Sequence, residues 1–294
     1  MLKFQKNIVS AAVAVVAFWL CAFSVAHAWG MLSGDQSQLL DYQNVLSKEP
    51  KEALTTFVMM GFRLVGLFLG IGALLILASL FLRREFRQIQ DAVLLKWALL
   101  SFVIAGTIYG GLMRIVSNQQ GAALLFFFSM LLYLVLYSLV GQRTKTNGLF
   151  NSIVLLPLYA ILLYTMGMPG WAKIFGGDQV INRYVNMFSQ SFIADLPGGT
   201  ALMIYILGIL ELAVPAFLTI SLASGEFKLY ADKIWFNYAL LLSIFTFGML
   251  CFGLAVLLNF AGSTNLVFYP IFTLLILVSL NKTIKRNKRY SDEA

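Results

Sequence analysis

The stretch Gly208-Ile-Leu-Glu211-Leu-Ala-Val-Pro215 lies near the middle of an apolar run, residues 198–227, that is long enough to cross a bilayer. An ionisable side chain at that depth is costly, so such groups are usually paired, accessible to water or functional. Pro215 has no N–H, so the backbone carbonyl of Glu211 loses its helical donor. The stretch predicts a membrane-spanning helix with two polar groups in one turn. Either the helix is kinked and the carboxylate has its hydrogen-bonding partners inside a helical bundle, or the two groups form a site for a ligand, a proton or a quinone.

The composition places the whole chain in a membrane. Its 294 residues are 60% hydrophobic and only 12% charged, and the mean hydropathy is +0.83, values far outside the range of soluble domains. About 20 apolar residues are needed to cross the hydrocarbon core as a helix. Runs of about that length predict an all-α integral membrane protein with eight transmembrane helices, at residues 8–28, 58–82, 93–116, 122–140, 150–168, 200–222, 234–259 and 264–280.

The first apolar run has two interpretations. Lys3 and Lys6 precede it, and Ala26-His27-Ala28 at its end resembles a signal-peptidase site, so a cleaved signal peptide would leave seven helices. We favour an uncleaved helix, because the repeat described below pairs this segment with one that cannot be a signal peptide.

The basic residues of the connections predict the orientation. The chain has 21 lysines and arginines against 13 acidic residues, and most of the excess falls in one set of connections and in residues 282–289. Cytoplasmic connections are enriched in Lys and Arg, so both termini are predicted to be cytoplasmic. The two long connections, residues 29–57 and 171–199, would then face outward with short interfacial helices. No basic face carries base-stacking aromatic residues, so membrane lipids are expected partners and nucleic acid is not.

Few residues could hold a metal or perform nucleophilic catalysis. His27 is the single histidine, which excludes a bis-histidine haem, a zinc triad or a Ser-His-Asp triad within this chain. Cys21 and Cys251 both lie in apolar runs, and no metal-ligand spacing or phosphate-cradling loop occurs. No haem or metal is therefore expected.

The two long outer connections repeat one another. With Trp29 placed on Trp171, four further pairs align without a gap: Leu32 with Ile174, Gly34 with Gly176, Tyr42 with Tyr184 and Asn44 with Asn186. Such matches in polar loops are harder to obtain by chance than matches between apolar helices. They predict an internal duplication, with residues 1–145 as a first four-helix repeat and residues 146–294 as a second that ends in a basic cytoplasmic tail. Four spans in each copy would give both the same orientation, as two parallel repeats.

Short motifs in the second half resemble a known family of membrane proteins. They are Gly170-Trp171-Ala-Lys173, then Leu196-Pro197, then Gly208-Ile-Leu-Glu211-Leu. With these motifs, residues 150–280 resemble the DoxX-like family of four-helix membrane proteins. The resemblance implies a compact four-helix unit of the bacterial cytoplasmic (inner) membrane, often with quinone-linked or redox-linked partners.

The resemblance singles out Lys173 and Glu211, the lysine and the glutamate of the family's motifs. The first half departs from the pattern, because Met31 stands where Lys173 aligns and Arg63 lies near the place of Glu211. Chemistry that needs both family residues is therefore not expected in the first half, which would act as a scaffold or supply a partner charge.

Arg63, Trp171 and Tyr184 are further candidates for ion-pair or ligand contacts. Arg63 is the second charge inside a predicted span, and it either snorkels to the outer interface or pairs with Glu211. Trp171, Lys173 and Tyr184 lie at the predicted outer interface. Such side chains either anchor to headgroups or line a mouth that admits a headgroup, a quinone or a small anion.

Two glycine motifs in the first half predict close helix packing. Gly66-x-x-x-Gly70 and Gly106-x-x-x-Gly110 each put two small residues on one face of a helix. Small residues let two helix backbones approach each other. We expect packing inside the first bundle in preference to dimerisation.

Two classes of function follow. The first is binding or assembly, in which the protein holds a lipophilic small molecule, such as a quinone, or a membrane redox protein near Glu211 without a complete active site of its own. The alternative is a transporter of a small solute or lipid, with Glu211 and the Pro215 kink as its site. An enzyme is the least supported class, because no base lies at motif spacing from a nucleophile.

Overall fold

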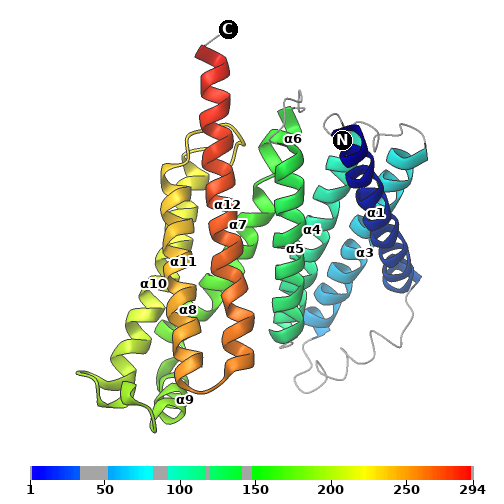
Figure 1. The fold of residues 1–294 in the computed structure, drawn as a ribbon. Coiled ribbons are helices and arrows are strands. Elements are labelled where there is room, and N and C mark those ends of the chain that lie inside the picture. The colour runs from blue at the N-terminus through cyan, green and yellow to red at the C-terminus, as the bar shows by residue number, and fades with distance from the viewer. Residues whose placement is uncertain (1, 34–51, 82–91, 117–118, 141–147, 293–294) are drawn as a thin grey trace. The chain divides into compact units, whose positions relative to one another are not determined.

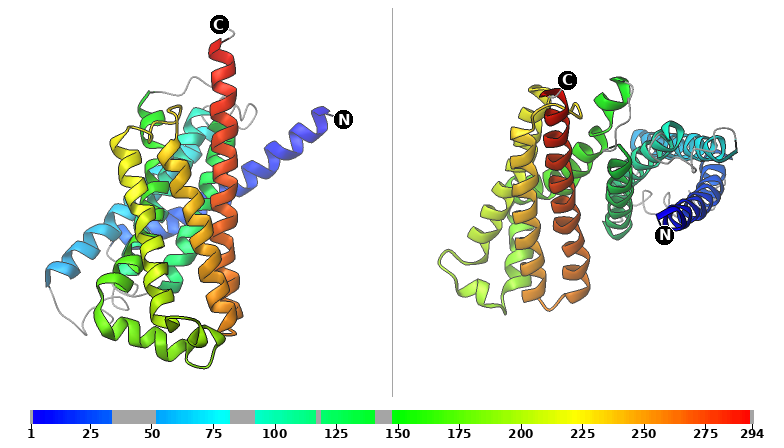
Figure 2. Two further views of the ribbon diagram at one scale, coloured as in Figure 1. Left: turned by 90° about the vertical axis from the view of Figure 1, so that its left-hand side faces the viewer. Right: turned by 45° about the horizontal axis from the view of Figure 1, so that its top comes forward.

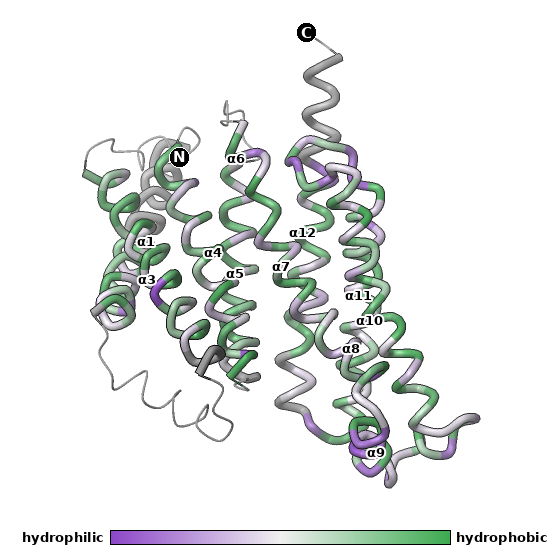
Figure 3. The backbone as a smooth tube through the Cα atoms, turned by 180° about the vertical axis from the view of Figure 1, so that it is seen from behind, coloured by the Kyte–Doolittle hydropathy of each residue, from purple (hydrophilic) through white to green (hydrophobic). Residues whose placement is uncertain are grey.

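The computed structural model describes residues 2–33, 52–81, 92–116, 119–140 and 148–292, and every regular element within these ranges is a helix (Figure 1). Seven helices of the described ranges are long and apolar enough to cross a membrane: Thr56–Phe81, Val93–Ile115, Gly121–Leu139, Gly148–Phe175, Gly199–Ala223, Ile234–Val256 and Gly262–Lys282. Each coincides with a predicted run. The chain is therefore a helical, multi-pass membrane protein, and apolar residues dominate its helices (Figure 3).

The eighth predicted span, residues 8–28, lies within α1, a continuous helix over Leu2–Ser33. The described side chains of α1 give a shorter apolar stretch, Ala17–Leu32. Eight spans, and the choice between an anchor and a cleaved signal, therefore stay predictions.

The chain divides into two compact units, Met1–Phe150 and Asn151–Ala294. The predicted boundary between residues 145 and 146 lies outside the described residues. Unit 1 contains α1, α3 (Glu52–Phe81), α4 (Val93–Ile115) and α5 (Gln119–Val140). Within it, each helix packs against the next one in the chain (Figure 2).

The glycine motifs of unit 1 lie at these helix contacts. Gly66 and Gly70 of α3 face Met31 and Ala28 of α1. Gly106 and Gly110 of α4 face α5, at the side chains of Ser129 and Phe126. The predicted packing of these glycines inside the first bundle is confirmed.

The first membrane-spanning helix of unit 2 is built from several pieces. After α6 (Gly148–Ile153) come α7 (Leu156–Leu162), a π-helical turn η3 (Leu163–Gly167) and α8 (Met168–Phe175). Pro157 and Pro169 fall in the first turns of α7 and α8, where a missing N–H is tolerated. The prolines therefore mark where the helix changes its hydrogen-bonding pattern.

The rest of unit 2 consists of α9 (Gly177–Phe188), η4 (Phe192–Asp195), α10 (Gly199–Ala223), α11 (Ile234–Val256) and α12 (Phe260–Asp292). α10 packs against η3, α8 and α11, and α11 packs against α12. α9 confirms a short helix in the second long connection, whereas most of the first connection lies outside the described residues. Within unit 2, α9 lies at one end, and the α10–α11 connection lies at the other with the end of α12 (Figure 1).

Candidate functional site: a buried lysine–glutamate pair

Glu211 lies in the middle of α10, as the thirteenth of its 25 residues. It is completely buried, with 0% of its surface exposed, and it belongs to the face of α10 that the unit buries. A carboxylate in this position requires a partner, because moving an isolated charge out of water is very unfavourable.

That partner is Lys173 of α8. Its Nζ atom lies 2.6 Å from both Oε1 and Oε2 of Glu211 and donates a hydrogen bond to each. Lys173 is itself only 3% exposed. Each charge thus offsets the desolvation of the other, and either one left alone would be strongly unfavourable.

Two glycines bring the helices of the pair together. A Cβ atom on Gly170 of α8 would lie 2.8 Å from Cβ of Glu211, and one on Gly208 of α10 would lie 3.0 Å from Cβ of Lys173. Real Cβ atoms are very rarely that close to another carbon, so both positions need a residue without a side chain. The Gly-x-x-Lys and Gly-x-x-Glu motifs therefore have a physical reason: each glycine admits the charged residue of the other helix.

The backbone is irregular beside the pair. Pro215 lies inside α10, four residues after Glu211, and removes a helical donor there. Opposite it, the π-helical turn ends at Gly167, where a Cβ atom would lie 3.3 Å from Cγ of Pro215. π-Helical turns inside α-helices occur frequently at functional sites.

Tyr184 of α9 lies beside the pair. The Nζ atom of Lys173 lies 5.8 Å from the centroid of the Tyr184 ring, within the range of a cation–π interaction. Trp171 does not join this group: it is 61% exposed and packs on Phe175, with ring centroids 4.3 Å apart. Of the two aromatic candidates, only Tyr184 lies at the pair.

Arg63 is exposed on α3 of unit 1. A pair between Arg63 and Glu211 would join the two units and stays a prediction. The ion partner that the structure shows for Glu211 is Lys173, 38 residues earlier in the chain. The sequence singled out both residues but did not pair them, because Lys173 was placed at the outer interface and Glu211 near mid-membrane.

The sequence reasoning missed a second buried carboxylate, Glu226, in the α10–α11 connection. Its two oxygens accept hydrogen bonds from three backbone N–H groups at the start of α11 and from the hydroxyl of Ser221, at 2.8–3.1 Å. The hydroxyl groups of Tyr159 and Ser221 are 2.7 Å apart. Glu226 thus caps α11 and ties it to α10 and α7, an arrangement that we call the Glu226 clasp.

Lys233 closes the same connection. It is 3% exposed, and its Nζ atom donates to the backbone carbonyls of Glu226 at 2.6 Å and Lys228 at 2.7 Å. Burial lowers the pKa of Lys233 to about 8, although the carboxylates of Glu226 and Asp232 raise it. Neither residue stood out in the sequence, because a carboxylate eight to ten residues before the N–H groups that it caps follows no local capping motif.

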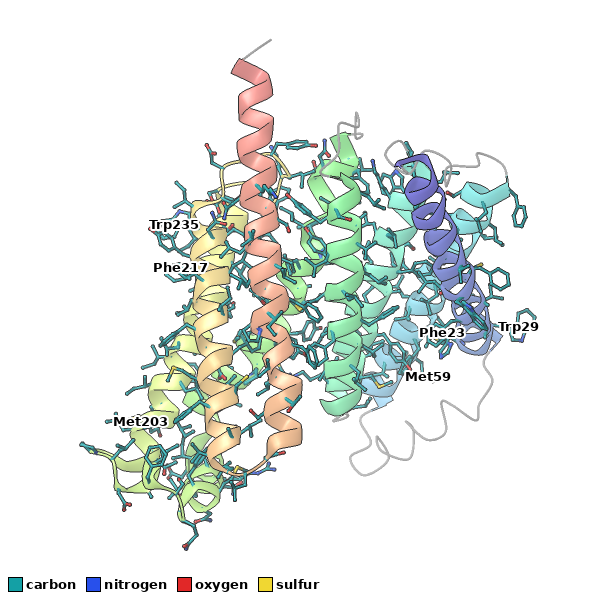
Figure 4. All side chains as sticks on the ribbon, in the orientation of Figure 1. Phe23, Trp29, Met59, Met203, Phe217 and Trp235 are labelled. Atoms are coloured by element: carbon teal, nitrogen blue, oxygen red, sulfur yellow. The ribbon has the colours of Figure 1, made fainter. Side chains whose placement is uncertain are left out.

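Aromatic residues gather outside the clasp. The rings of Phe217 and Trp235 stack with centroids 5.9 Å apart (Figure 4), and Tyr238 adjoins both at 6.2 Å. Trp and Tyr are typical of membrane–water interfaces. The cluster is consistent with an interface at this end of unit 2.

Comparison with known proteins adds no relative. No family model matches the chain, and neither the curated proteins nor the solved structures include a match.

Proposed function

We propose that this membrane protein binds a lipophilic small molecule with a polar, quinone-like head at the Lys173–Glu211 pair. The observation that carries the proposal is the pair itself: two complementary charges, 0% and 3% exposed, with Glu211 in the middle of the spanning helix α10. The protein would act by holding this ligand, or by holding it for a membrane redox protein, without a complete active site of its own.

The chemistry of the pair suits such a head group. The ammonium of Lys173 donates to a quinone carbonyl, and the carboxylate of Glu211 accepts from a quinol hydroxyl. Tyr184 adds an aromatic ring beside Lys173. A ligand that replaces one member of the pair as hydrogen-bonding partner would enter where η3 and Pro215 already interrupt regular helix.

The setting is part of the same proposal. The motifs around Lys173 and Glu211 favour a DoxX-like protein of the bacterial inner membrane, with eight spans in two parallel four-helix repeats. In unit 2 the α10–α11 connection and the basic end of α12 lie at the same end (Figure 1), which supports a cytoplasmic C-terminus by the positive-inside rule. In each unit, the helices pack in chain order, which supports the repeat.

Native mass spectrometry of the gently purified protein tests the proposal. The wild type is expected to retain a small molecule whose mass identifies its class, and Glu211→Gln is expected to lose it while staying folded. Lys228→Gln is the matched control, because it also removes one charge from unit 2 but its side chain is exposed. A short-chain benzoquinone added as a probe should bind to the wild type and the control only. Equal retention by all three proteins would refute the proposal.

A transporter of a small solute or lipid is the second candidate. The observation that favours it is the coincidence of two irregular helices, since Gly167 of η3 lies against Pro215 of α10 and broken helices commonly line transport sites. In proteoliposomes, uptake should then depend on a pH gradient, and Glu211→Gln should abolish that dependence. Uptake that is the same in wild type and Glu211→Gln would exclude this use of the site.

A further inference from the structure

In each unit a spanning helix meets an earlier helix at a glycine, α3 with α1 in unit 1 and α10 with α8 in unit 2, and the two contacts correspond. In unit 1, a Cβ atom on Gly66 of α3 would lie 3.0 Å from Cβ of Met31 in α1. In unit 2, one on Gly208 of α10 would lie 3.0 Å from Cβ of Lys173 in α8. The other side chains within contact of these Cβ positions are Leu32, at 3.2 Å from the one on Gly66, and Ile174, at 2.9 Å from the one on Gly208. All three correspondences have the same spacing of 142 residues, from 66 to 208, from 31 to 173 and from 32 to 174.

This spacing is the one that the outer connections give. Trp29 and Trp171, and Tyr42 and Tyr184, are also 142 residues apart. A shift of one residue turns an α-helix by about 100°, so a wrong register would bring a different side chain to each glycine. The contacts of Gly66 and Gly208 were not used to align the connections. The alignment nevertheless predicts that these two glycines contact corresponding residues.

Buried positions follow the same register. Buried residues that correspond in α3 and α10 include Phe62 with Ile204, Ile76 with Leu218 and Ser79 with Ser221, whereas buried Val65 and Ala73 correspond to the partly buried Leu207 and Pro215. Both serines are completely buried at 0%. Serine is one of the small residues that let membrane helices pack closely, and the register places one at the same position in both units.

In this register, Met31 takes the place of Lys173, and Leu69 takes the place of Glu211. Met31 is buried, at 7% exposed, and Leu69 is partly buried. We propose that the two units are copies of one four-helix fold in a gap-free register of 142 residues, and that Met31 and Leu69 mark the uncharged form of the Lys173–Glu211 site. Of these two corresponding sites, the one in unit 2 then carries an ion pair, and the seam between the first two helices of a unit packs without the charges.

Grafting the pair into unit 1 tests the register without reference to any ligand. In the full chain, Met31→Lys and Leu69→Glu are each expected to lower the melting temperature in detergent, because each puts an unpaired charge into an apolar seam. The double variant Met31→Lys/Leu69→Glu should melt above Met31→Lys alone, because the new charges meet as Lys173 and Glu211 do. The matched control is Met31→Lys/Phe68→Glu, whose carboxylate lies one residue out of register and should add to the loss.

The register would be overturned if the two losses of melting temperature add up in Met31→Lys/Leu69→Glu. It would also be overturned if Met31→Lys/Phe68→Glu recovered as much of the melting temperature. If the grafted variants do not fold, the reverse exchange decides: Lys173→Met/Glu211→Leu gives unit 2 the apolar residues of unit 1 and should melt near the wild type. A loss in this reverse variant as large as the sum of its two single losses would also overturn the proposal. A wild type without a bound ligand would refute the proposed function and leave both results unaffected.

Discussion

Among the described residues of unit 2, two carboxylates are buried along a line that we call the α10 seam, Glu211 within α10 and Glu226 just after its end, and they are held in different ways. Glu211 is held by a side-chain cation, the ammonium of Lys173. Glu226 is held by three backbone N–H groups of α11 and by the hydroxyl of Ser221. A side chain can change its partner by changing rotamer, whereas the N–H groups at a helix start cannot leave unless the helix moves. Glu226 therefore has a structural role, because its backbone partners are fixed. Glu211 has a side-chain partner, which a ligand could replace under the proposed function.

Apolar side chains separate the two carboxylates. Val214 and Leu218 lie on α10 between Glu211 and Ser221, and both are completely buried at 0%. Glu211 and Ser221, the α10 residue in the clasp, are ten residues apart, or about 15 Å along a helix. Substitutions at such a distance usually act independently, so each of the following predictions tests one end of the seam against the other.

Lys173→Met should have the largest effect. It leaves the carboxylate of Glu211 buried without its cation, and breaking a buried pair in this way costs about 3–5 kcal/mol of unfolding free energy. Adding Glu211→Gln should restore most of the loss, because the amide is neutral. Unfolding by denaturant in mixed micelles measures both values. A double variant no more stable than Lys173→Met alone would show that the pairing is not what stabilises this end.

Glu226→Ala should cost somewhat less, about 3 kcal/mol, because it removes a charged acceptor shared by four donors. Unlike the loss at Lys173, this loss should have no compensating substitution, since three of the donors belong to the backbone. The same micelle unfolding measures it, with Ser221→Ala as the second variant. If Ser221→Ala restored the stability of Glu226→Ala, Glu226 would be a side-chain pair like Glu211, and the distinction would fail.

The sequence predicted the seven described spans well, because length and hydropathy determine which helices can cross a bilayer. It also singled out Lys173, Glu211, Pro215 and Tyr184, which the structure places in one region. It did not predict that Lys173 reaches Glu211, because that depends on how closely α8 approaches α10. The closeness comes from Gly170 and Gly208, two residues that are ordinary in any membrane helix.

The Glu226 clasp was missed for another reason. Its donors at residues 234–236 lie eight to ten residues after Glu226, and a connection of that length can fold in many ways. Capping motifs are recognised at a spacing of about three residues, so no local pattern indicates this cap. The sequence signal of this cap is its polar partner Ser221, a hydroxyl residue inside an apolar run. The structure shows that Ser221 is completely buried.

Lys233 predicts a pH dependence of the clasp end alone. Burial lowers the pKa of Lys233 from its usual 10.5 to about 8, so above pH 8 the unfolded chain binds this proton more tightly than the folded one. The free energy of unfolding should therefore rise between about pH 8 and 10.5, by at most about 3 kcal/mol. The neutral amine keeps two N–H donors for the carbonyls of Glu226 and Lys228. Denaturant unfolding across this pH range should show the rise in the wild type and not in Lys233→Met. An equal rise in the variant would assign the dependence to another group.

Tyr159→Phe should have the smallest effect, and it tests whether the two ends are independent. It removes the hydroxyl that lies 2.7 Å from that of Ser221 and keeps the ring that stacks on Phe236, with centroids 4.6 Å apart. The loss of one neutral hydrogen bond costs about 1 kcal/mol. Ser221 still donates to Glu226, so the cap on α11 remains. Native mass spectrometry should therefore find the proposed ligand of the Lys173–Glu211 pair retained as in the wild type. If Tyr159→Phe released that ligand, the carboxylates would be coupled across the apolar seam, and Glu226 would belong to the functional site as well as to the fold.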